Sequence, residues 1–243
     1  MPGADGYTAE WYKACRGIIM PMLKKCFNYV LGGGEAPMSW RQAIISVIPK
    51  AGKDKTECGS YRPISVLNID YRLFASIIAK RLEDIIPEVI DYDQTGFVMD
   101  RQTHDSTRRA LHIIKHMSKS KNGSVAVSLD AEKAFDSVRW GYLYLVLQRF
   151  GFNEQVIGII EALYCSPTAR IKVNGSLSKP ISLNRGCRQG CPLSPTLFAL
   201  YIEPLAQAIR EEGEITDRKD NLLGGERFQV RFSTHLQWTT HKV

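Results

Sequence analysis

The sequence lacks the features of several protein classes. None of its six cysteines forms a C-x-x-C pair, the spacing that many zinc sites and redox-active disulfides use. No uninterrupted apolar run reaches membrane-spanning length, and the first residues, MPGADGYTAEWYK, contain no apolar signal-peptide core. Internal repeats and low-complexity segments are also absent. We therefore expect an intracellular protein, nuclear or cytoplasmic, that is not secreted, keeps its thiols reduced and has no contact with a membrane.

The composition is typical of a globular protein that has a polyanionic partner. Hydrophobic residues make up 44% of the 243 residues and charged residues 23%, and this length suits one large domain or two modest subdomains. The formal net charge is +7, which favours binding to nucleic acid. A basic surface without such a partner would have the same composition, so the charge alone does not decide between the two.

Residues 123–140, GSVAVSLDAEKAFDSVRW, combine a predicted strand with a carboxylate at its end. The apolar residues of 125–129 alternate with small ones, which is the pattern of a buried strand. Asp130 follows directly, and Asp136 or Ser137 is a candidate cap for the next helix. A carboxylate at the end of a strand suits catalysis, because the strand holds it rigidly. The simpler interpretation is that Asp130 only ends the strand or caps a turn.

Hydrophobic periodicity elsewhere predicts an α+β fold. Asn174 and Gly175 between two β-rich runs predict a hairpin turn, and Pro87 is expected to end or kink the helix before it. His112 and His116 lie four residues apart without a third metal ligand, so we expect a solvated or nucleic-acid-facing edge. The expected helices cover residues 8–31, 71–86, 103–117, 138–150, 154–164 and a long segment that begins near Pro192 or Pro195; the expected strands cover residues 44–48, 169–173 and 179–183.

Four blocks of the sequence, in order, carry motifs of one family. They are IPKAGKD…YRPIS, QTGFVMDR, DAEKAFD and RGCRQGCPLSP, within a matching region of roughly residues 2–216. They resemble reverse transcriptases in the form used by non-LTR retrotransposons of the long interspersed element type. The last block is the most specific, and YRPIS and CRQGCPLSP favour this form over the alternative of a group II intron-like reverse transcriptase. The resemblance implies an α+β, right-hand polymerase architecture with fingers, an incomplete palm and no thumb.

The same resemblance suggests boundaries within the chain. Residues 1–35 would form an N-terminal helical segment and residues 36–122 the fingers. Residues 123–213 would form a partial palm with a helical and hairpin insertion, with the first catalytic motif at 125–138 and the RQGCPLSP motif at 185–213. Residues 214–243 do not resemble the family, and we expect a divergent tail that a truncated or shifted reading frame would explain.

The resemblance implies nucleotidyl transfer with two Mg²⁺ ions, which stabilise the attacking and leaving oxygens. Asp130 would be the catalytic carboxylate and, together with the Ala131 carbonyl, a metal ligand. Arg62 would grip the triphosphate, because a planar guanidinium can bind two phosphate oxygens at once. Phe135 would exclude a ribose 2′-hydroxyl, although an ordinary core aromatic is the plainer role for a phenylalanine.

Further site residues follow from the resemblance alone, and for several of the cations a solvated surface position is an equally good interpretation. The expected partners are an RNA template, a DNA primer and deoxynucleotide triphosphates. The implied nucleotide-binding residues are Lys50, Lys53, Arg62, Ala131, Lys133, Ala134, Phe135 and Gln189; the implied template or primer contacts are Gly96, Phe97, Arg101, Arg188 and Gly190.

One element of the family pattern is missing from the sequence. The next motif of the family carries alanine followed by two adjacent aspartates, and no Asp-Asp pair occurs in the 243 residues. One carboxylate does not hold two divalent ions in place, so we expect that this chain does not polymerise nucleotides. Two other interpretations stay open: a non-catalytic nucleic-acid-binding remnant, and a fragment that does not fold stably.

Overall fold

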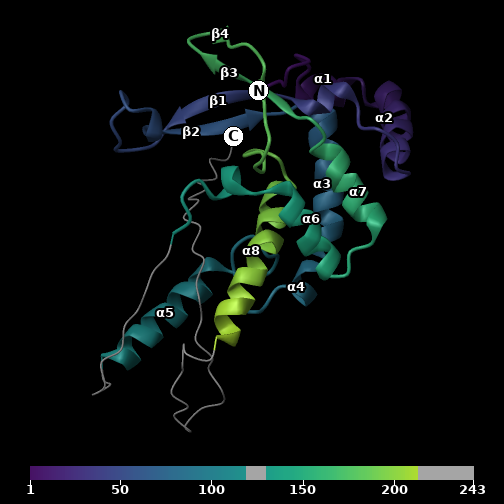
Figure 1. Ribbon diagram of the computed structural model, residues 1–243. Helices are drawn as coiled ribbons and strands as arrows, with labels where there is room; N and C mark the ends of the chain where they lie inside the picture. Colours follow the sequence, from purple (N-terminus) through teal and green to yellow (C-terminus); the bar gives the residue numbers. More distant parts are fainter. Residues whose placement is uncertain (119–129, 213–243) are drawn as a thin grey trace.

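The structure, a computed structural model, describes residues 1–118 and 130–212. A small sheet lies at one end of the molecule, and helices extend away from it, with α5 projecting far from the sheet (Figure 1). The helices are α1 (Ala9–Ala14), α2 (Arg16–Leu31), α3 (Ile69–Glu83), α4 (Ile86–Val89), α5 (Thr103–Met117), α6 (Trp140–Arg149), α7 (Glu154–Leu163) and α8 (Ser194–Glu211), with short 3₁₀ turns at Met38–Arg41, Cys58–Ser60 and Ala134–Ser137. The strands are β1 (Gln42–Pro49), β2 (Tyr61–Val66), β3 (Thr168–Val173), β4 (Ser176–Leu177) and β5 (Ile181–Ser182).

Strand β1 joins two distant parts of the chain in one sheet. It pairs antiparallel with β2, where Ile48 lies opposite Arg62, and parallel with β3, where Gln42 lies opposite Thr168. β3 in turn pairs antiparallel with β4 and β5. A parallel pair needs a long crossover, and here α3 to α7 lie between β1 and β3. The sheet therefore connects the predicted fingers to the predicted palm insertion, while the boundary between them stays a prediction.

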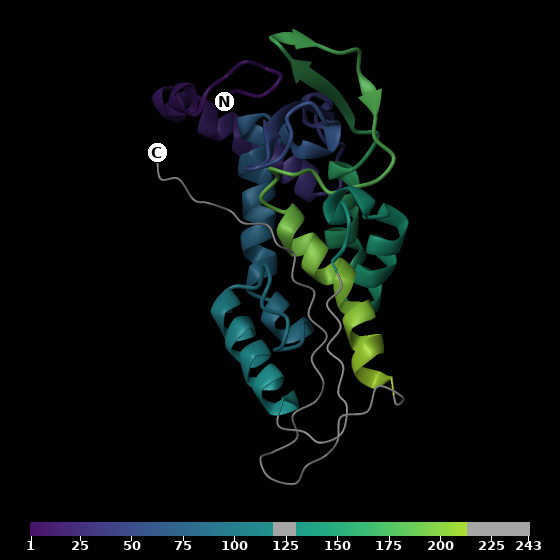
Figure 2. The same cartoon turned by 90° about the vertical axis from the view of Figure 1, so that its left-hand side faces the viewer.

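Aromatic side chains fill the part of the core next to α3. Trp40 is 1% exposed, and its ring centroid lies 4.9 Å from that of Phe74, while Phe27 of α2 contacts both rings. Trp40 Nε1 donates to Asp70 Oδ2 at 2.7 Å, so the polar group of this buried indole is satisfied. On the other side of the core, α8 packs against α6 and α3 (Figure 2).

Most of the predicted elements are confirmed. α5 has the predicted bounds, and the predicted strand at residues 44–48 lies inside β1, which ends at Pro49 because proline has no N–H for the ladder. Asn174 and Gly175 form the predicted turn with φ values of +49° and +81°. The predicted strand at 179–183 is wrong in extent: β4 and β5 have two residues each, since Pro180 between them cannot donate to the ladder.

Two expectations about helix ends are wrong. Helix α6 begins at Trp140 with Arg139 as its N-cap residue, so neither Asp136 nor Ser137 caps it. The reason is that Asp136 and Ser137 belong to the preceding 3₁₀ turn, which ends before the helix starts. Pro87 does not end α3 either; it lies in the first turn of α4, where the missing N–H of proline costs no helical hydrogen bond.

The predicted strand at residues 125–129 and the predicted tail at 214–243 lie outside the described residues. Within the described part of the chain, no helix is long and apolar enough to cross a membrane. The six cysteines are free thiols. The fold is a mixed α+β fold with a small sheet, and its assignment to fingers and palm stays a prediction.

Candidate nucleotide and nucleic-acid site

Three segments that are far apart in the sequence meet near the end of β2. They are the end of β2, residues 133–138 and residues 185–191, which we call the motif cluster. Ser65 N donates to Gln189 O at 2.7 Å, and Cys187 N donates to Phe135 O at 2.7 Å. Backbone hydrogen bonds therefore hold together the blocks YRPIS, DAEKAFD and RGCRQGCPLSP.

Two glycines allow this close approach. A Cβ at Gly190 would lie 2.6 Å from Ser65 O, and the φ of Gly190 is +109°, so a larger residue fits neither the space nor the backbone. At Gly186, with φ +98°, a Cβ would lie 3.3 Å from the Cα and O of Asp136. These distances show that the backbone approaches both glycines closely. The template contact assigned to Gly190 stays a prediction.

The turn that follows residue 130 presents oxygen atoms and a cation to solvent. Asp130 and Ala131 are exposed, and Lys133 adopts the left-handed conformation with φ 50° and ψ 42°, which turns the chain sharply. The carboxylate of Asp136 is hydrogen-bonded to the Gln189 side chain. Partial burial raises the pKa of Asp136, while the contact with Gln189 and the charge of Lys133 oppose this shift. The turn therefore exposes Asp130 at one end. At its other end it binds residues 185–191, which contain Gly186 and Gly190 and which we call the glycine-containing loop.

Phe135 lies in the aromatic core. It is 6% exposed, its ring stacks on Phe198 of α8 with centroids 5.0 Å apart, and Phe97 meets it edge-on at 5.9 Å. Ala134, the residue before it, is partly buried against the same core. The structure thus brings Phe97, and with it the QTGF block, to the motif cluster. This burial matches the plainer role of a core aromatic, and exclusion of a 2′-hydroxyl by Phe135 stays a prediction.

The predicted phosphate-binding cations belong to the hairpin of β1 and β2. Arg62 is partly buried on β2. Lys50 Nζ donates to Gly59 O at 2.9 Å, which links the two ends of the hairpin's own turn, and Lys53 is exposed on that turn. The turn extends away from the helices (Figure 1). The three cations thus lie on one projecting hairpin, and their contact with phosphate stays a prediction.

The guanidinium group of Arg188 points into the protein. Arg188 is 4% exposed, and it donates to Trp40 O at 2.8 Å and to Arg41 O at 3.3 Å. It also lies 5.1 Å from the centroid of the Tyr71 ring, a cation–π contact. Arg188 therefore anchors the glycine-containing loop to the segment before β1. Its predicted template contact is not tested by this geometry.

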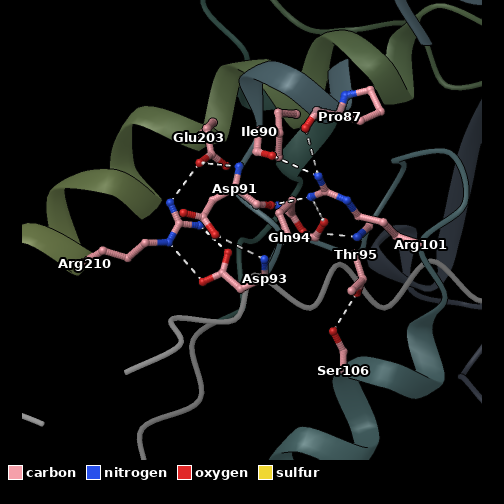
Figure 3. Close-up of polar contacts among 11 residues, drawn as sticks. Pro87, Ile90, Asp91, Asp93, Gln94, Thr95, Arg101, Ser106, Glu203 and Arg210 are labelled. Carbon is pink, nitrogen blue, oxygen red and sulfur yellow. Dashed lines mark hydrogen bonds and ion pairs between the residues drawn. The ribbon is translucent and has the colours of Figure 1, made fainter. Parts of the chain in front are cut away.

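Arg101 also satisfies backbone carbonyls. Its guanidinium donates to Gln94 O at 2.8 Å, to Ile90 O at 3.0 Å, to Pro87 O at 3.3 Å and to Asp91 O (Figure 3). Burial lowers the pKa of Arg101, although nearby carboxylates oppose the shift. Arg101 thus holds the turn that precedes Gly96 and Phe97, and its template contact stays a prediction. Gly96 N donates to Gln94 Oε1 at 3.2 Å, which continues the same turn.

A buried ion cluster beside this turn was not found by sequence reasoning. Arg210 of α8 pairs with Asp93 and Glu203, and the three side chains are 8%, 5% and 0% exposed (Figure 3). One signal was available: Glu203 lies on the apolar face of α8, between Leu200 and Ala206, and a charge on a buried helix face needs a partner. Nothing in the sequence around Asp93 indicates which arginine it binds.

These observations fit a template-dependent nucleotide polymerase. In the mixed α+β fold, backbone hydrogen bonds join the hairpin that carries the basic residues, the turn that follows the exposed Asp130, and the loop that contains Gly186 and Gly190. Residues 48–222 match the family described as Reverse transcriptase (RNA-dependent DNA polymerase). The chain belongs to this family.

Several relatives come from mobile elements. The chain is 36% identical over 211 residues to the Transposon TX1 uncharacterized 149 kDa protein of Xenopus laevis, covering 86% of this chain and 16% of that protein. It is 32% identical over 207 residues to the Retrovirus-related Pol polyprotein from type-1 retrotransposable element R2 of Popillia japonica, covering 84% and 28%. It is 29% identical over 205 residues to the RNA-directed DNA polymerase from mobile element jockey of Drosophila melanogaster, covering 82% and 22%. The predicted membership of the non-LTR retrotransposon group is confirmed, and the chain spans between 16% and 28% of these relatives.

Reverse transcriptases generally use divalent metal ions, for which oxygen atoms are the preferred ligands. The exposed Asp130 carboxylate and the Ala131 carbonyl are ligands of this kind. Within residues 1–118 and 130–212, no group of three or more His, Cys, Asp or Glu side chains could hold a metal ion.

Proposed function

We propose that this chain forms the fingers and part of the palm of an RNA-directed DNA polymerase of a non-LTR retrotransposon. Its partners would be an RNA template, a DNA primer and deoxynucleotide triphosphates, inside the cell, in the nucleus or the cytoplasm. The observation that carries the proposal is the contact among all four sequence blocks: Ser65, Phe135 and Gln189 lie in the motif cluster, and Phe97 packs on Phe135.

In the proposed reaction, a primer 3′-hydroxyl attacks the α-phosphorus of the triphosphate and pyrophosphate leaves. Bound Mg²⁺ would stabilise charge on the attacking and leaving oxygens. Asp130 and the Ala131 carbonyl would hold the metal. Arg62 would bind the triphosphate, with Lys50 and Lys53 approaching from the hairpin, because each cation offsets phosphate charge.

Other residues would position the nucleotide. The backbone N–H groups of Lys133 and Ala134 lie in the sharp turn and are candidate donors to phosphate oxygens. Phe135 would stand against the sugar, and Gln189, fixed by its contact with Asp136, would lie beside the nucleotide.

A further set of residues would shape the template path. Gly96, Phe97 and Gly190 would form the surface along which the template lies. Arg101 and Arg188 hold backbone carbonyls, and this bonding supports a role in shaping that surface through the loops that they anchor.

We also propose that this polypeptide does not extend a primer, because it has no adjacent aspartate pair to complete the metal ligands. Primer extension on an RNA template with Mg²⁺ tests this with two proteins. One is the native chain, and the other is a chimera in which the region after Thr216 is replaced by the corresponding region of a related element. Extension by the chimera alone, abolished by Asp130→Ala, is the expected result.

The two parts of the proposal fail separately. Asp130-dependent extension by the native chain would overturn the proposed inactivity. A chimera that binds an RNA–DNA hybrid but does not extend the primer would overturn the assignment of these residues to a polymerase site.

A second candidate function is nucleic-acid binding without catalysis, favoured by the net charge of +7 together with the missing aspartate pair. Fluorescence anisotropy of an RNA–DNA hybrid at several salt concentrations tests it. We expect Arg62→Gln to reduce the slope of log affinity against log salt by about 1, as loss of one phosphate contact does. Lys24→Gln removes an exposed cation of α2 and serves as the control. Equal slopes for both variants would contradict a phosphate contact at Arg62.

A further inference from the structure

Two arginines from different elements hold the same turn. Arg101, just before α5, donates to four backbone carbonyls within residues 87–94, and Arg210, in the last turn of α8, binds Asp93 in that segment (Figure 3). We call this arrangement the two-arginine clamp. The turn lies directly before Gly96 and Phe97, so the clamp fixes the start of the QTGF block.

The contact between Arg210 and Asp93 is bidentate. Arg210 Nε donates to Asp93 Oδ2 at 3.0 Å, and Arg210 Nη2 donates to Asp93 Oδ1. Such a pair fixes the orientation of the carboxylate relative to the guanidinium as well as the distance between them, because two parallel hydrogen bonds join two planar groups. Burial opposes the charge, but the hydrogen bonds that Arg210 donates to Asp93 and Glu203 raise the pKa of Arg210, which therefore stays charged.

Glu203 connects the arginine to the same turn by a second route. Its Oε1 accepts from Arg210 Nη1 at 2.8 Å and from Asp91 N at 3.3 Å. Its Oε2 is buried, and no group of the residues that the structure describes forms a hydrogen bond with it. One oxygen of this buried carboxylate thus accepts a hydrogen bond from the arginine and another from the turn.

Helix α8 contacts this region at two places. Near its start, Phe198 stacks on Phe135, which in turn meets Phe97 edge-on. Arg210 lies 12 residues later, about 18 Å along the helix. On another side, Phe97 borders an open pocket of about 310 Å³ that Pro195 and Met99 also line. Phe97 thus contacts the Phe135 ring and follows directly after the turn that Arg101 binds.

We infer that Arg210 is a positioning residue: through Asp93 it holds the turn of residues 91–94, and through that turn it holds Phe97 against Phe135 in the motif cluster. Nucleotide selection at Phe135 would then depend on an ion pair at the far end of α8. This functional consequence rests on the proposed polymerase function, whereas the mechanical coupling does not.

Hydrogen exchange followed by mass spectrometry on the full chain tests the coupling. In Arg210→Met, we expect amides of residues 91–101 to exchange at least about 100-fold faster, and those of Ser137 and Cys187, next to Phe135, about tenfold faster. Amides of the β1–β2 hairpin should be unchanged. A residue that supports only global stability would accelerate exchange in the hairpin to the same degree, so the regional pattern separates the two roles.

Two further variants cover the case in which Arg210→Met does not fold. Arg210→Lys keeps the charge but removes the planar guanidinium that binds Asp93 through two hydrogen bonds. It should therefore give the same regional pattern, with amide exchange about tenfold faster at residues 91–101. Asp93→Asn should match it. Glu35→Gln is the control. It removes an ion pair with Arg41, but the Glu35 side chain is 91% exposed, so the exchange rates should not change. Acceleration confined to residues 91–101, with Ser137 and Cys187 unchanged, would overturn the coupling.

The functional consequence is measured in the active chimera as the ratio of deoxynucleotide to ribonucleotide incorporation. This ratio does not depend on the fraction of folded enzyme. We expect Arg210→Lys to lower it several-fold and Glu35→Gln to leave it unchanged. An unchanged ratio would overturn the functional consequence; an inactive chimera would overturn the proposed function, and the exchange experiment would still decide the coupling.

Discussion

The motif cluster and the two-arginine clamp meet at the contact between Phe97 and Phe135, but different groups hold them. In the motif cluster, backbone donates to backbone, as from Ser65 N to Gln189 O, and glycine makes the approach possible. In the clamp, side chains from distant elements bind backbone carbonyls and the Asp93 carboxylate of a turn. The motif cluster is therefore disrupted by adding atoms, and the clamp by removing donors or charges.

The largest effect is expected from an added methyl group in the motif cluster. Gly190→Ala should lower the free energy of unfolding by about 3 kcal/mol or more, because its Cβ meets Ser65 O and the positive φ adds strain. Urea unfolding measures the change. Gly158→Ala in α7 is the matched control, since nothing lies within 4 Å of its Cβ; it should stabilise the protein by up to about 1 kcal/mol. Equal effects at the two sites would show that the close approach to β2 is not real.

A smaller loss is expected in the clamp. Arg101→Met removes the donor of four carbonyl bonds, and we expect a loss of about 2 kcal/mol, since water can reach only part of the freed carbonyls. Arg72→Met on the exposed face of α3 is the control and should change the free energy by less than about 0.5 kcal/mol. Urea unfolding of both variants decides whether the clamp matters for stability; a loss as small as the control's would contradict it.

High pH should weaken the motif cluster. Burial raises the pKa of the Cys187 thiol to about 12 from an ordinary value of 9.0, and burial also raises the pKa of Tyr71 and Tyr164. Above pH 9 for the thiol and above pH 10 for the tyrosines, the unfolded chain loses these protons while the folded chain keeps them, so stability present at lower pH is lost as the pH rises toward 12. Between pH 8 and 10 the free energy of unfolding should fall by about 1 kcal/mol.

The control for this profile is an exposed thiol. Cys187→Ala should flatten the decline, whereas Cys58→Ala, at an exposed position, should leave it unchanged. A stability that is constant between pH 8 and 10 would contradict the neutral, buried state of Cys187.

The smallest effect is a difference in labelling that leaves the fold intact. At neutral pH a maleimide should modify Cys58 and Cys165 rapidly, because both are exposed, and Cys187 and Cys191 only after unfolding. Peptide mass spectrometry before and after denaturation measures this. Rapid labelling of Cys191 in the native protein would mean that its contact with the Tyr71 hydroxyl, at 3.4 Å, does not shield the thiol from the reagent.

Short sequence patterns predicted the helices, strand ends and turns that depend only on residues next to one another in the chain. The bounds of α5, the end of β1 at Pro49 and the turn at Asn174 depend on periodicity, a missing N–H and a glycine that accepts positive φ. Phe135 was open between a site residue and a core aromatic; its burial matches the core position, and the site role stays a prediction. The cap of α6 was wrong because Ser137 ends the preceding 3₁₀ turn, and two linker residues, Val138 and Arg139, separate it from the start of the helix at Trp140.

The sequence by itself determined the family and the residue types that its chemistry needs, since these depend on the order of motifs along the chain. Only the tertiary structure decided where the charged groups point. Arg188 and Arg101 satisfy carbonyls, and Arg210 finds Asp93 at a separation of 117 residues. The physical reason is that a buried charge must be paired by whatever group the fold brings within reach, and that neighbour is set by packing rather than by local sequence.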